Sequence, residues 1–323
     1  MTAIPPVLVP PAQGQEEIRT AARAGLAALQ GVVVGKEAQV QRAFAAMLAG
    51  GHVLLEDLPG VGKTTLAKGL SRILGGSFQR VQGTNDLLPS DLLGVHLWEA
   101  KEQRFQFQPG PVFCNVLLVD ELNRIGPKTQ SAMLEAMVEG QVTLDRSNHL
   151  LPDPFLVIAT QNPLDHAGTF PLPESQLDRF SCSLHLGYPN RAAERRILLG
   201  EAGSERLDTL GPALDMPGWQ QARQAIRGVR VAEAVLDYAE RMVARLRSAG
   251  NFCSTRAVRH WLGLAQAEAW LEGRDFITPD DLQRTLADTM AHRGSLDDRR
   301  LNRSERREQL AGLLKDLPVG WSQ

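Results

Sequence analysis

The feature that most constrains the fold is a short apolar run followed by a glycine-rich loop and then a helical stretch. Residues 52–55 have the composition of a buried strand, residues 56–65 contain the loop, and residues 66–74 have helical periodicity. A strand that enters a tight loop and then a helix directs successive backbone N–H groups, and the positive end of the helix dipole, toward one point. The sequence therefore predicts an anion-binding loop between a strand and a helix.

The letters of this loop match the phosphate-binding motif G-x-x-x-x-G-K-[ST] except at its first position, where Asp57 replaces glycine. The glycines allow the backbone to close around phosphate oxygens without a Cβ clash. Lys63 is predicted to reach the β- and γ-phosphates of ATP, and the Thr64 hydroxyl to bind Mg²⁺. An ordinary glycine-rich turn with an incidental Lys-Thr pair is the alternative. The predicted nucleotide-binding residues of the loop are Pro59, Gly60, Val61, Gly62, Lys63, Thr64 and Thr65.

A second apolar run, residues 116–119, ends in two acids, Asp120 and Glu121. A buried strand delivers its last side chains to the carboxyl edge of the sheet, where ligands of open α/β sheets bind. Asp120 is predicted to hold Mg²⁺, and Glu121 to polarise the attacking water as a general base. The alternative is two solvated acids that cap the next helix. Together with the phosphate loop, the pair predicts an enzyme that binds and hydrolyses ATP.

Strand-like and helical patterns alternate along the first part of the chain, which predicts an α/β fold with a mainly parallel sheet covered by helices on both faces. The other strand patterns lie at residues 78–81 and 155–159, with a weaker one at 184–186. After Tyr188-Pro189 only helical patterns follow, which predicts a smaller all-helical domain. Thr278-Pro279-Asp280-Asp281 is typical of a helix start within it.

These patterns divide the chain into three parts. The predicted parts are a flexible, proline-rich N-terminal tail at 1–13, a nucleotide-binding α/β domain at 14–188, and a helical domain at 189–323. The charge-rich stretch 297–308 is interpreted as a solvated helix. The sequence assigns no role to the whole segment 295–323.

Composition argues against several classes of protein. A net charge of −2 over 323 residues gives no global cationic field for nucleic acid. The three cysteines lack metal-ligand or redox-motif spacing and are interpreted as buried thiols in a reducing compartment. No apolar run approaches the roughly 18 residues that a membrane span needs. We therefore expect a cytoplasmic protein without a membrane segment, for which nucleic acid is an unlikely partner.

With both motifs and a helical C-terminal part, the chain resembles the AAA+ ATPases and, within them, the MoxR family. The resemblance covers residues 32–286, and family members often carry Asp-x-Pro-Gly at the loop position of Asp57. Five stretches carry it in order: Val33-Val34-Gly35-Lys36, residues 52–65, Val119-Asp120-Glu121-Leu122-Asn123-Arg124, Ala159-Thr160-Gln161-Asn162-Pro163, and Leu172-Pro173-Glu174-Ser175-Gln176-Leu177-Asp178-Arg179-Phe180.

The resemblance implies further site residues. Asn162 matches sensor 1, whose amide hydrogen-bonds the γ-phosphate and the attacking water; an Asn-Pro turn is the alternative. Arg179 matches the arginine finger, which enters the neighbouring subunit's site; a surface ion pair is the alternative. Val34 and Gly35 match the segment that contacts adenine, although a plain core strand and turn would look the same.

The resemblance also implies a sensor 2 arginine at the start of a helix in the helical domain. Arg256 is the candidate, and it would reach the γ-phosphate bound by its own chain. The family pattern there is Ser-Pro-Arg-Ala, and Thr255 replaces the proline. Arg259 is the alternative.

Two insertions match hairpins of this AAA+ clade. Residues 83–110 predict a short helix and a hairpin, and residues 141–151 predict a hairpin before sensor 1. In related rings these elements face the pore or a partner. Solvent-facing loops that grip nothing are the alternative.

The resemblance implies an ATPase that uses ATP and Mg²⁺ in a homo-oligomeric ring, with six copies as the family's expectation, to remodel or mature a protein partner like a chaperone. The partner is expected to be a separate protein, as families of this type pair with von Willebrand factor A domains. The alternatives are a magnesium-chelatase-like motor subunit, a nucleic-acid motor and a nucleotide-gated scaffold that hydrolyses ATP too slowly to matter. The sequence does not identify the client or the direction of remodelling.

Overall fold

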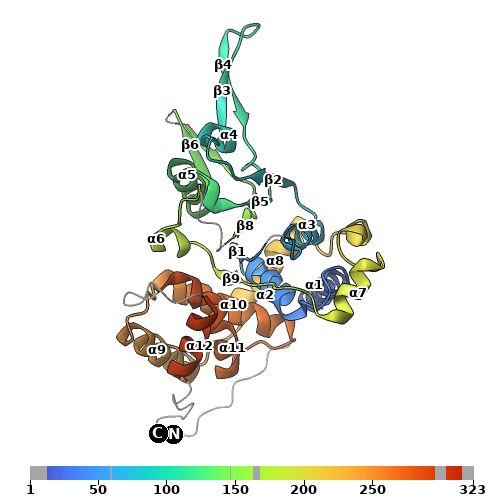
Figure 1. The fold of residues 1–323 in the computed structure, drawn as a ribbon, viewed down its shortest axis with the longest axis vertical. Helices are drawn as coiled ribbons and strands as arrows, with labels where there is room; N and C mark the ends of the chain where they lie inside the picture. The colour runs from blue at the N-terminus through green and yellow to red at the C-terminus, as the bar shows by residue number, and fades with distance from the viewer. Residues whose placement is uncertain (1–12, 59, 146, 163–167, 295–302, 315–323) are drawn as a thin grey trace.

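The computed structural model describes residues 13–58, 60–145, 147–162, 168–294 and 303–314. The molecule is elongated, with two hairpins at one end, a sheet in the middle and a helical part at the other end (Figure 1). The predicted tail at 1–13 lies outside the described residues except for Gln13, which begins the first helix.

Within the described part of the chain, five parallel strands form one sheet in the order β2-β5-β8-β1-β9. The inner strands β5 and β1 are buried along their whole length because helices cover both faces of the sheet. Since all five strands run the same way, the residues that follow β1, β5 and β8 meet at one edge. The strands are β1 (Val53–Glu56), β2 (Phe78–Gln82), β5 (Val116–Asp120), β8 (Leu156–Gln161) and β9 (Cys182–Leu184).

Side chains alternate between two cores along each strand. On β5, Leu118 joins the larger core, whereas Leu117 and Val119 join the smaller one. The larger core is formed with α1 (Gln13–Val32), α2 (Glu37–Leu48) and α3 (Lys63–Leu74), and the smaller one with α5 (Pro127–Glu139). The α/β fold with helices on both faces is therefore confirmed.

The chain becomes all-helical after β9, as predicted. Thr278 caps α11 through a capping box with Asp281, as its sequence pattern indicates. Trp219 and Trp261 are fully buried in the core that α1 and α2 also share, so the helical part packs directly under the sheet. Its elements are α7 (Arg191–Leu198), η2 (Ser204–Thr209), α8 (Met216–Arg227), α9 (Glu233–Ser248), α10 (Thr255–Leu271), α11 (Pro279–Met290), η3 (Ala291–Arg293) and α12 (Arg303–Leu314).

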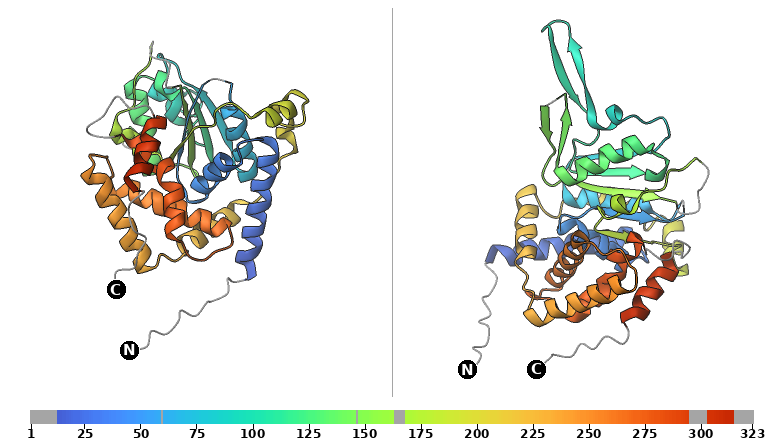
Figure 2. Two further views of the ribbon diagram at one scale, coloured as in Figure 1. Left: turned by 60° about the horizontal axis from the view of Figure 1, so that its bottom comes forward. Right: turned by 90° about the vertical axis from the view of Figure 1, so that its left-hand side faces the viewer.

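Both predicted hairpins are present. They are β3 (Gly94–Glu99) with β4 (Arg104–Pro109), preceded by α4 (Pro89–Leu93), and β6 (Gln141–Leu144) with β7 (Ser147–Leu150). Both project from the same end of the molecule, and β3–β4 reaches farther from the sheet (Figure 2). The remaining short elements are η1 (Leu122–Arg124) and α6 (Glu174–Leu177). Among the described residues, no helix is both long and apolar enough to cross a bilayer.

All three cysteines are buried and free, as the sequence indicated. Burial raises the pKa of the Cys114 and Cys182 thiols to about 12. Both thiols are therefore poor nucleophiles near neutral pH.

A buried histidine joins β1 to its neighbours. The Nδ1 atom of His52 accepts a hydrogen bond from the Val157 backbone N–H at 3.0 Å, so the proton lies on Nε2, which contacts the Met137 carbonyl oxygen at 3.1 Å. Burial lowers the pKa of His52 from 6.5 to about 4. The folded protein therefore holds a neutral imidazole at neutral pH.

This histidine predicts a loss of stability in mild acid. Between pH 6.5 and 4 the unfolded chain binds a proton at His52 and the folded chain does not. The contribution of His52 to the free energy of unfolding is therefore complete above pH 6.5 and falls as the pH is lowered. The contribution lost is about 3 kcal/mol. Urea unfolding of the wild type and His52→Gln at pH 4.5–7.5 tests this: the stability difference between them should shrink in acid. A difference that is independent of pH would contradict the assignment.

Candidate functional site: a nucleotide site at the carboxyl edge of the sheet

The predicted phosphate loop connects β1 to α3. Gly60 and Gly62 have φ values of 83° and 97°, a backbone conformation that residues with a side chain rarely adopt. A Cβ atom on either glycine would meet no atom within 4 Å. The loop is thus open on the side where an anion would lie. Gly62 is the N-cap of α3, where no side chain caps the helix and no acid lies in the first turn. The positive end of α3 is therefore available to an anion.

The other loop residues differ in exposure and in their contacts. Val61 is buried, whereas Lys63, Thr64 and Thr65 in the first turn of α3 are partly exposed. The Lys63 ammonium folds back over the loop and donates to the carbonyl oxygens of Asp57 at 2.5 Å and Leu58 at 3.2 Å. Pro59 lies outside the described residues.

Lys63 also lies in the field of the predicted acids. Burial lowers the pKa of its ammonium, while the carboxylates of Asp57, Asp120 and Glu121 act in the opposite direction. The fold therefore brings the ends of β1 and β5 together at the edge where the sequence predicted a site.

Asp120 is buried at the end of β5. Its Oδ2 atom pairs with Arg80 Nε at 2.8 Å, and its Oδ1 atom accepts from the Thr160 hydroxyl at 3.2 Å. The same hydroxyl oxygen accepts the Glu121 backbone N–H at 3.0 Å. Thr160 on β8 thus holds both acids in place from the neighbouring strand.

Glu121 has a left-handed backbone, with φ 58° and ψ 52°. A side-chain-bearing residue rarely adopts this conformation, and such strain is concentrated at functional sites. Its carboxylate accepts from Gln82 Nε2 at 3.0 Å and pairs with Arg124 Nε at 3.2 Å. Glu121 is the N-cap of η1 but makes no side-chain cap bond there. The alternative of a capping acid therefore does not describe it.

Gln82 orients the Glu121 carboxylate, so its removal should lower the rate of turnover. We expect Gln82→Ala to lower kcat by up to about 10-fold, because Glu121 loses one charge-assisted hydrogen bond. Nucleotide affinity should be retained. Steady-state phosphate release and nucleotide titration measure the two quantities. Gln79→Ala, on an exposed position of the same strand, is the matched control. An unchanged kcat would show that the contact does not position Glu121.

The remaining predicted contacts of the nucleotide lie around this edge. Asn162 directly follows β8, and its carbonyl oxygen accepts from Asn123 Nδ2 at 3.4 Å. Val34 is buried against Ala193 of α7, and Gly35 has a φ of 71°. The structure therefore places the predicted sensor 1 at the same edge as the acids, and the predicted adenine segment against the start of the helical part.

Arg179 lies at the opposite edge of the sheet. It precedes β9, whose first residues align with the start of β1. Two residues after Arg179, the Ser181 N–H donates to the His52 carbonyl oxygen at 2.8 Å. Its guanidinium donates to the Leu134 carbonyl oxygen. One chain alone therefore does not bring Arg179 to its own phosphate loop.

Arg256, the predicted sensor 2, lies beside Arg179 in the structure. Its guanidinium pairs with Asp178 Oδ2 at 3.7 Å. Asp178 is held there by the Ser254 hydroxyl, at 2.8 and 2.9 Å, and by the fully buried Arg293, at 2.9 Å. The helical part packs under the sheet and carries Arg256 to the edge where the strands begin.

Sequence reasoning missed the roles of Asp57, Arg80, Gln82 and Thr160. Arg80 and Gln82 alternate on β2, but only the order of strands reveals that β2 lies beside β5. Thr160 lies in the stretch that contains sensor 1. A hydroxyl at the end of a strand next to the acids is the sequence signal that could have indicated its contact with them. Asp57 departs from the phosphate-loop motif in the sequence, but the motif assigns no function to its side chain.

Comparisons with known proteins identify the family of the chain. Residues 52–182 match the family described as "ATPase family associated with various cellular activities (AAA)", and residues 243–311 match the AAA lid domain. The chain is 43% identical to the uncharacterized protein YeaC of Bacillus subtilis, over 81% of this chain and 83% of that protein. It is 34% identical to the chaperone MoxR1 of Mycobacterium tuberculosis, over 86% and 76% of the two chains.

A crystal structure from Cytophaga hutchinsonii, of a protein provisionally described as an ATPase, superposes with a TM-score of 0.82 at 31% identity. It covers 95% of this chain and 97% of its own. The similarity to these relatives, at 31–43% identity, thus extends over most of the length of the chain. The chain belongs to the MoxR family of AAA+ ATPases and is an ATP-hydrolysing enzyme.

Proposed function

We propose that this ATPase works as a ring, in which each site is completed by a neighbouring copy, and that hydrolysis drives the remodelling or maturation of a protein partner. The observation that carries the proposal is the separation of the candidate residues onto two edges of one sheet. Lys63 and Glu121 lie at the carboxyl edge, whereas Arg179 and Arg256 lie at the other. A ring of six copies, the number expected for the family, would bring the two edges together.

The carboxyl edge fits ATP and Mg²⁺. The open loop and the uncapped start of α3 would hold the phosphates, with Lys63 on the β- and γ-phosphates. The Thr64 hydroxyl and the Asp120 carboxylate are oxygen donors of the type that Mg²⁺ prefers. When bound, the ion supplies positive charge against the phosphates. Glu121 would accept a proton from water, and Asn162 would orient that water.

Arg179 and Arg256 of the neighbouring copy would supply the missing cations. Near the acids, Arg80 is paired with Asp120 and Arg124 with Glu121, so both are engaged with carboxylates of their own chain. A transferring phosphoryl group carries negative charge on its outer oxygens, and an arginine from outside the chain can stabilise it. This division of labour makes hydrolysis depend on assembly.

Assembly is tested by measuring the ATPase rate per chain against protein concentration, alongside the particle mass. We expect the rate per chain to rise as the mass changes from one copy to the ring. A rate per chain that stays constant while the mass falls to one copy would overturn the shared site.

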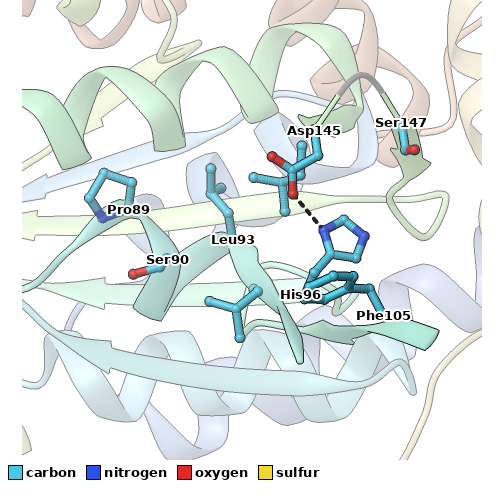
Figure 3. Close-up of a pocket in the computed structure, with 10 residues that line it drawn as sticks. Pro89, Ser90, Leu93, His96, Phe105, Asp145 and Ser147 are labelled. Atoms are coloured by element: carbon cyan, nitrogen blue, oxygen red, sulfur yellow. Dashed lines mark hydrogen bonds and ion pairs between the residues drawn. The ribbon is translucent and has the colours of Figure 1, made fainter. Parts of the chain in front are cut away.

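The two hairpins are the proposed contact with the partner. Leu97, Trp98 and Phe105 on β3–β4 are 55%, 56% and 67% exposed, an unusual concentration of apolar surface on a projecting element. Beside them lies a pocket of about 620 Å³ between α4 and the two hairpins (Figure 3), where His96 on β3 pairs with Asp145 at 2.9 Å. The partner is proposed to be a separate protein with a von Willebrand factor A domain.

Paired serine substitutions at Trp98 and Phe105 test the contact. Because both side chains are exposed, the basal ATPase rate is expected to be unchanged. Stimulation by, or binding to, a purified protein with a von Willebrand factor A domain is expected to be lost. Binding that survives both substitutions would show that the hairpin is not the contact.

A further inference from the structure

Asp57, the residue that departs from the phosphate-loop motif, is 1% exposed and its carboxylate is fully engaged with backbone N–H groups. Oδ2 accepts from Leu186 at 2.6 Å and Gly187 at 2.7 Å, and Oδ1 accepts from Leu58 at 2.9 Å. Backbone N–H bonds to a carboxylate are charge-assisted and among the stronger hydrogen bonds in proteins. The side chain therefore fastens the loop to a segment 129 residues away in sequence.

The same residue also contacts the nucleotide side of the loop. Its carbonyl oxygen accepts from Lys63 Nζ at 2.5 Å, and its N–H donates to the Gln161 carbonyl oxygen at 3.1 Å. The backbone of Asp57 thus bonds the phosphate-binding lysine, while its side chain bonds residues 186–187. His185 adds a further contact between these two segments: its Nδ1 atom lies 3.3 Å from Asp57 Oδ2 and 3.0 Å from the Glu56 carbonyl oxygen.

Residues 185–190 form the linker from β9 to α7, the first helix of the helical part. The Tyr188 carbonyl oxygen accepts from Lys36 Nζ at 2.6 Å, and Asn190 caps α7 through the Ala193 N–H at 2.9 Å. A Cβ on Gly35 would lie 2.7 Å from Ala193 Cβ, so the predicted adenine segment packs against the same helix. The linker therefore touches both segments that are assigned to the nucleotide.

Glycine is not required by the backbone at position 57. Among the described non-glycine residues, positive φ occurs at Gln103, Glu121 and Asp145 only. The conformation at this position is thus open to any residue, and what aspartate adds is the carboxylate that bonds the linker.

We propose that Asp57 is a positioning residue that couples the phosphate loop to the linker of the helical part, so that nucleotide binding sets the position of that linker. Phosphates that draw the Lys63 ammonium away from the loop carbonyls alter the bonds of Asp57, and the carboxylate passes this change to residues 186–187. The proposal rests on the nucleotide site proposed above.

The test is Asp57→Gly, which restores the common motif, together with Asp57→Asn, which keeps one acceptor oxygen. Two quantities are measured on the full chain: the Kd for a fluorescent ATP analogue, and amide hydrogen exchange of residues 185–190 with and without ADP. The glycine variant loses all three hydrogen bonds of the carboxylate. We expect the Kd to rise about 10-fold, which corresponds to the energy of about one of these bonds appearing in nucleotide binding. We also expect Leu186 and Gly187 to exchange faster and to lose their protection by nucleotide, with partial rescue by asparagine.

Asp215→Gly is the matched control, because the Asp215 carboxylate also holds a backbone N–H, that of Gly218 at 2.8 Å, but at the start of α8. It should lower stability without changing the Kd. A glycine variant at position 57 that keeps the wild-type Kd and nucleotide protection would overturn the proposal. The same holds if its Kd changes no more than that of Asp215→Gly. If Lys63→Ala retains nucleotide, the nucleotide site itself is wrong, which is a different failure from that of the coupling.

Discussion

Replacing Glu121 by glutamine is expected to abolish ATP turnover while ATP binding persists. The amide has nearly the shape of the carboxylate and can keep its contacts with Gln82 and Arg124, but it cannot accept a proton from water. General-base catalysis contributes on the order of 10²–10⁴-fold, so the loss in kcat should be of this size. Single-turnover phosphate release and equilibrium titration with nucleotide measure hydrolysis and binding separately.

Glu139→Gln, on an exposed position at the end of α5, is the control for the loss of one negative charge near the same domain. It should leave both quantities unchanged. If Glu121→Gln still turns over at the wild-type rate, Glu121 is not the base, and its left-handed backbone would need another explanation.

Arg179→Ala is expected to lower kcat by at least as much in the assembled protein. An arginine finger contributes on the order of 10³–10⁵ in rate where it has been measured, because it stabilises charge on the transferring phosphoryl group. The variant should bind nucleotide normally, since Arg179 lies at the sheet edge opposite Lys63 in its own chain. Arg227→Ala, on an exposed position of α8, is the matched control.

Mixing two inactive variants gives the sharper test. Arg179→Ala keeps its own phosphate loop, and Lys63→Ala keeps its arginine. In a mixed ring, some sites combine the intact loop of the first with the intact arginine of the second, so activity should partly return. Native mass spectrometry confirms that mixed rings form. Mixed rings without recovered activity, or full activity of Arg179→Ala alone, would exclude a finger that acts between chains. Arg256→Ala can be tested in the same way, because Asp178 holds Arg256 beside Arg179.

Much of the fold was readable from the sequence because the signals were local. The run at 116–119 became β5, the run at 52–55 became β1 shifted by one residue, and Thr278-Pro279 began α11. The weaker strand was misplaced: it was expected at 184–186 but is observed as Cys182–Leu184. Its pairing with Val53 sets the register, and Leu186 instead donates its N–H to Asp57.

The sequence by itself determined the phosphate loop and the acidic pair, because each is a few consecutive residues whose geometry follows from a strand that ends in a loop. It could not determine which distant residues support them. Gln82 meets Glu121 and Asp57 meets Leu186 only because five strands pack in one order, and that order depends on apolar contacts between segments far apart in the chain. Packing of the helical part likewise decided that Arg256 lies with Arg179 and away from its own phosphate loop.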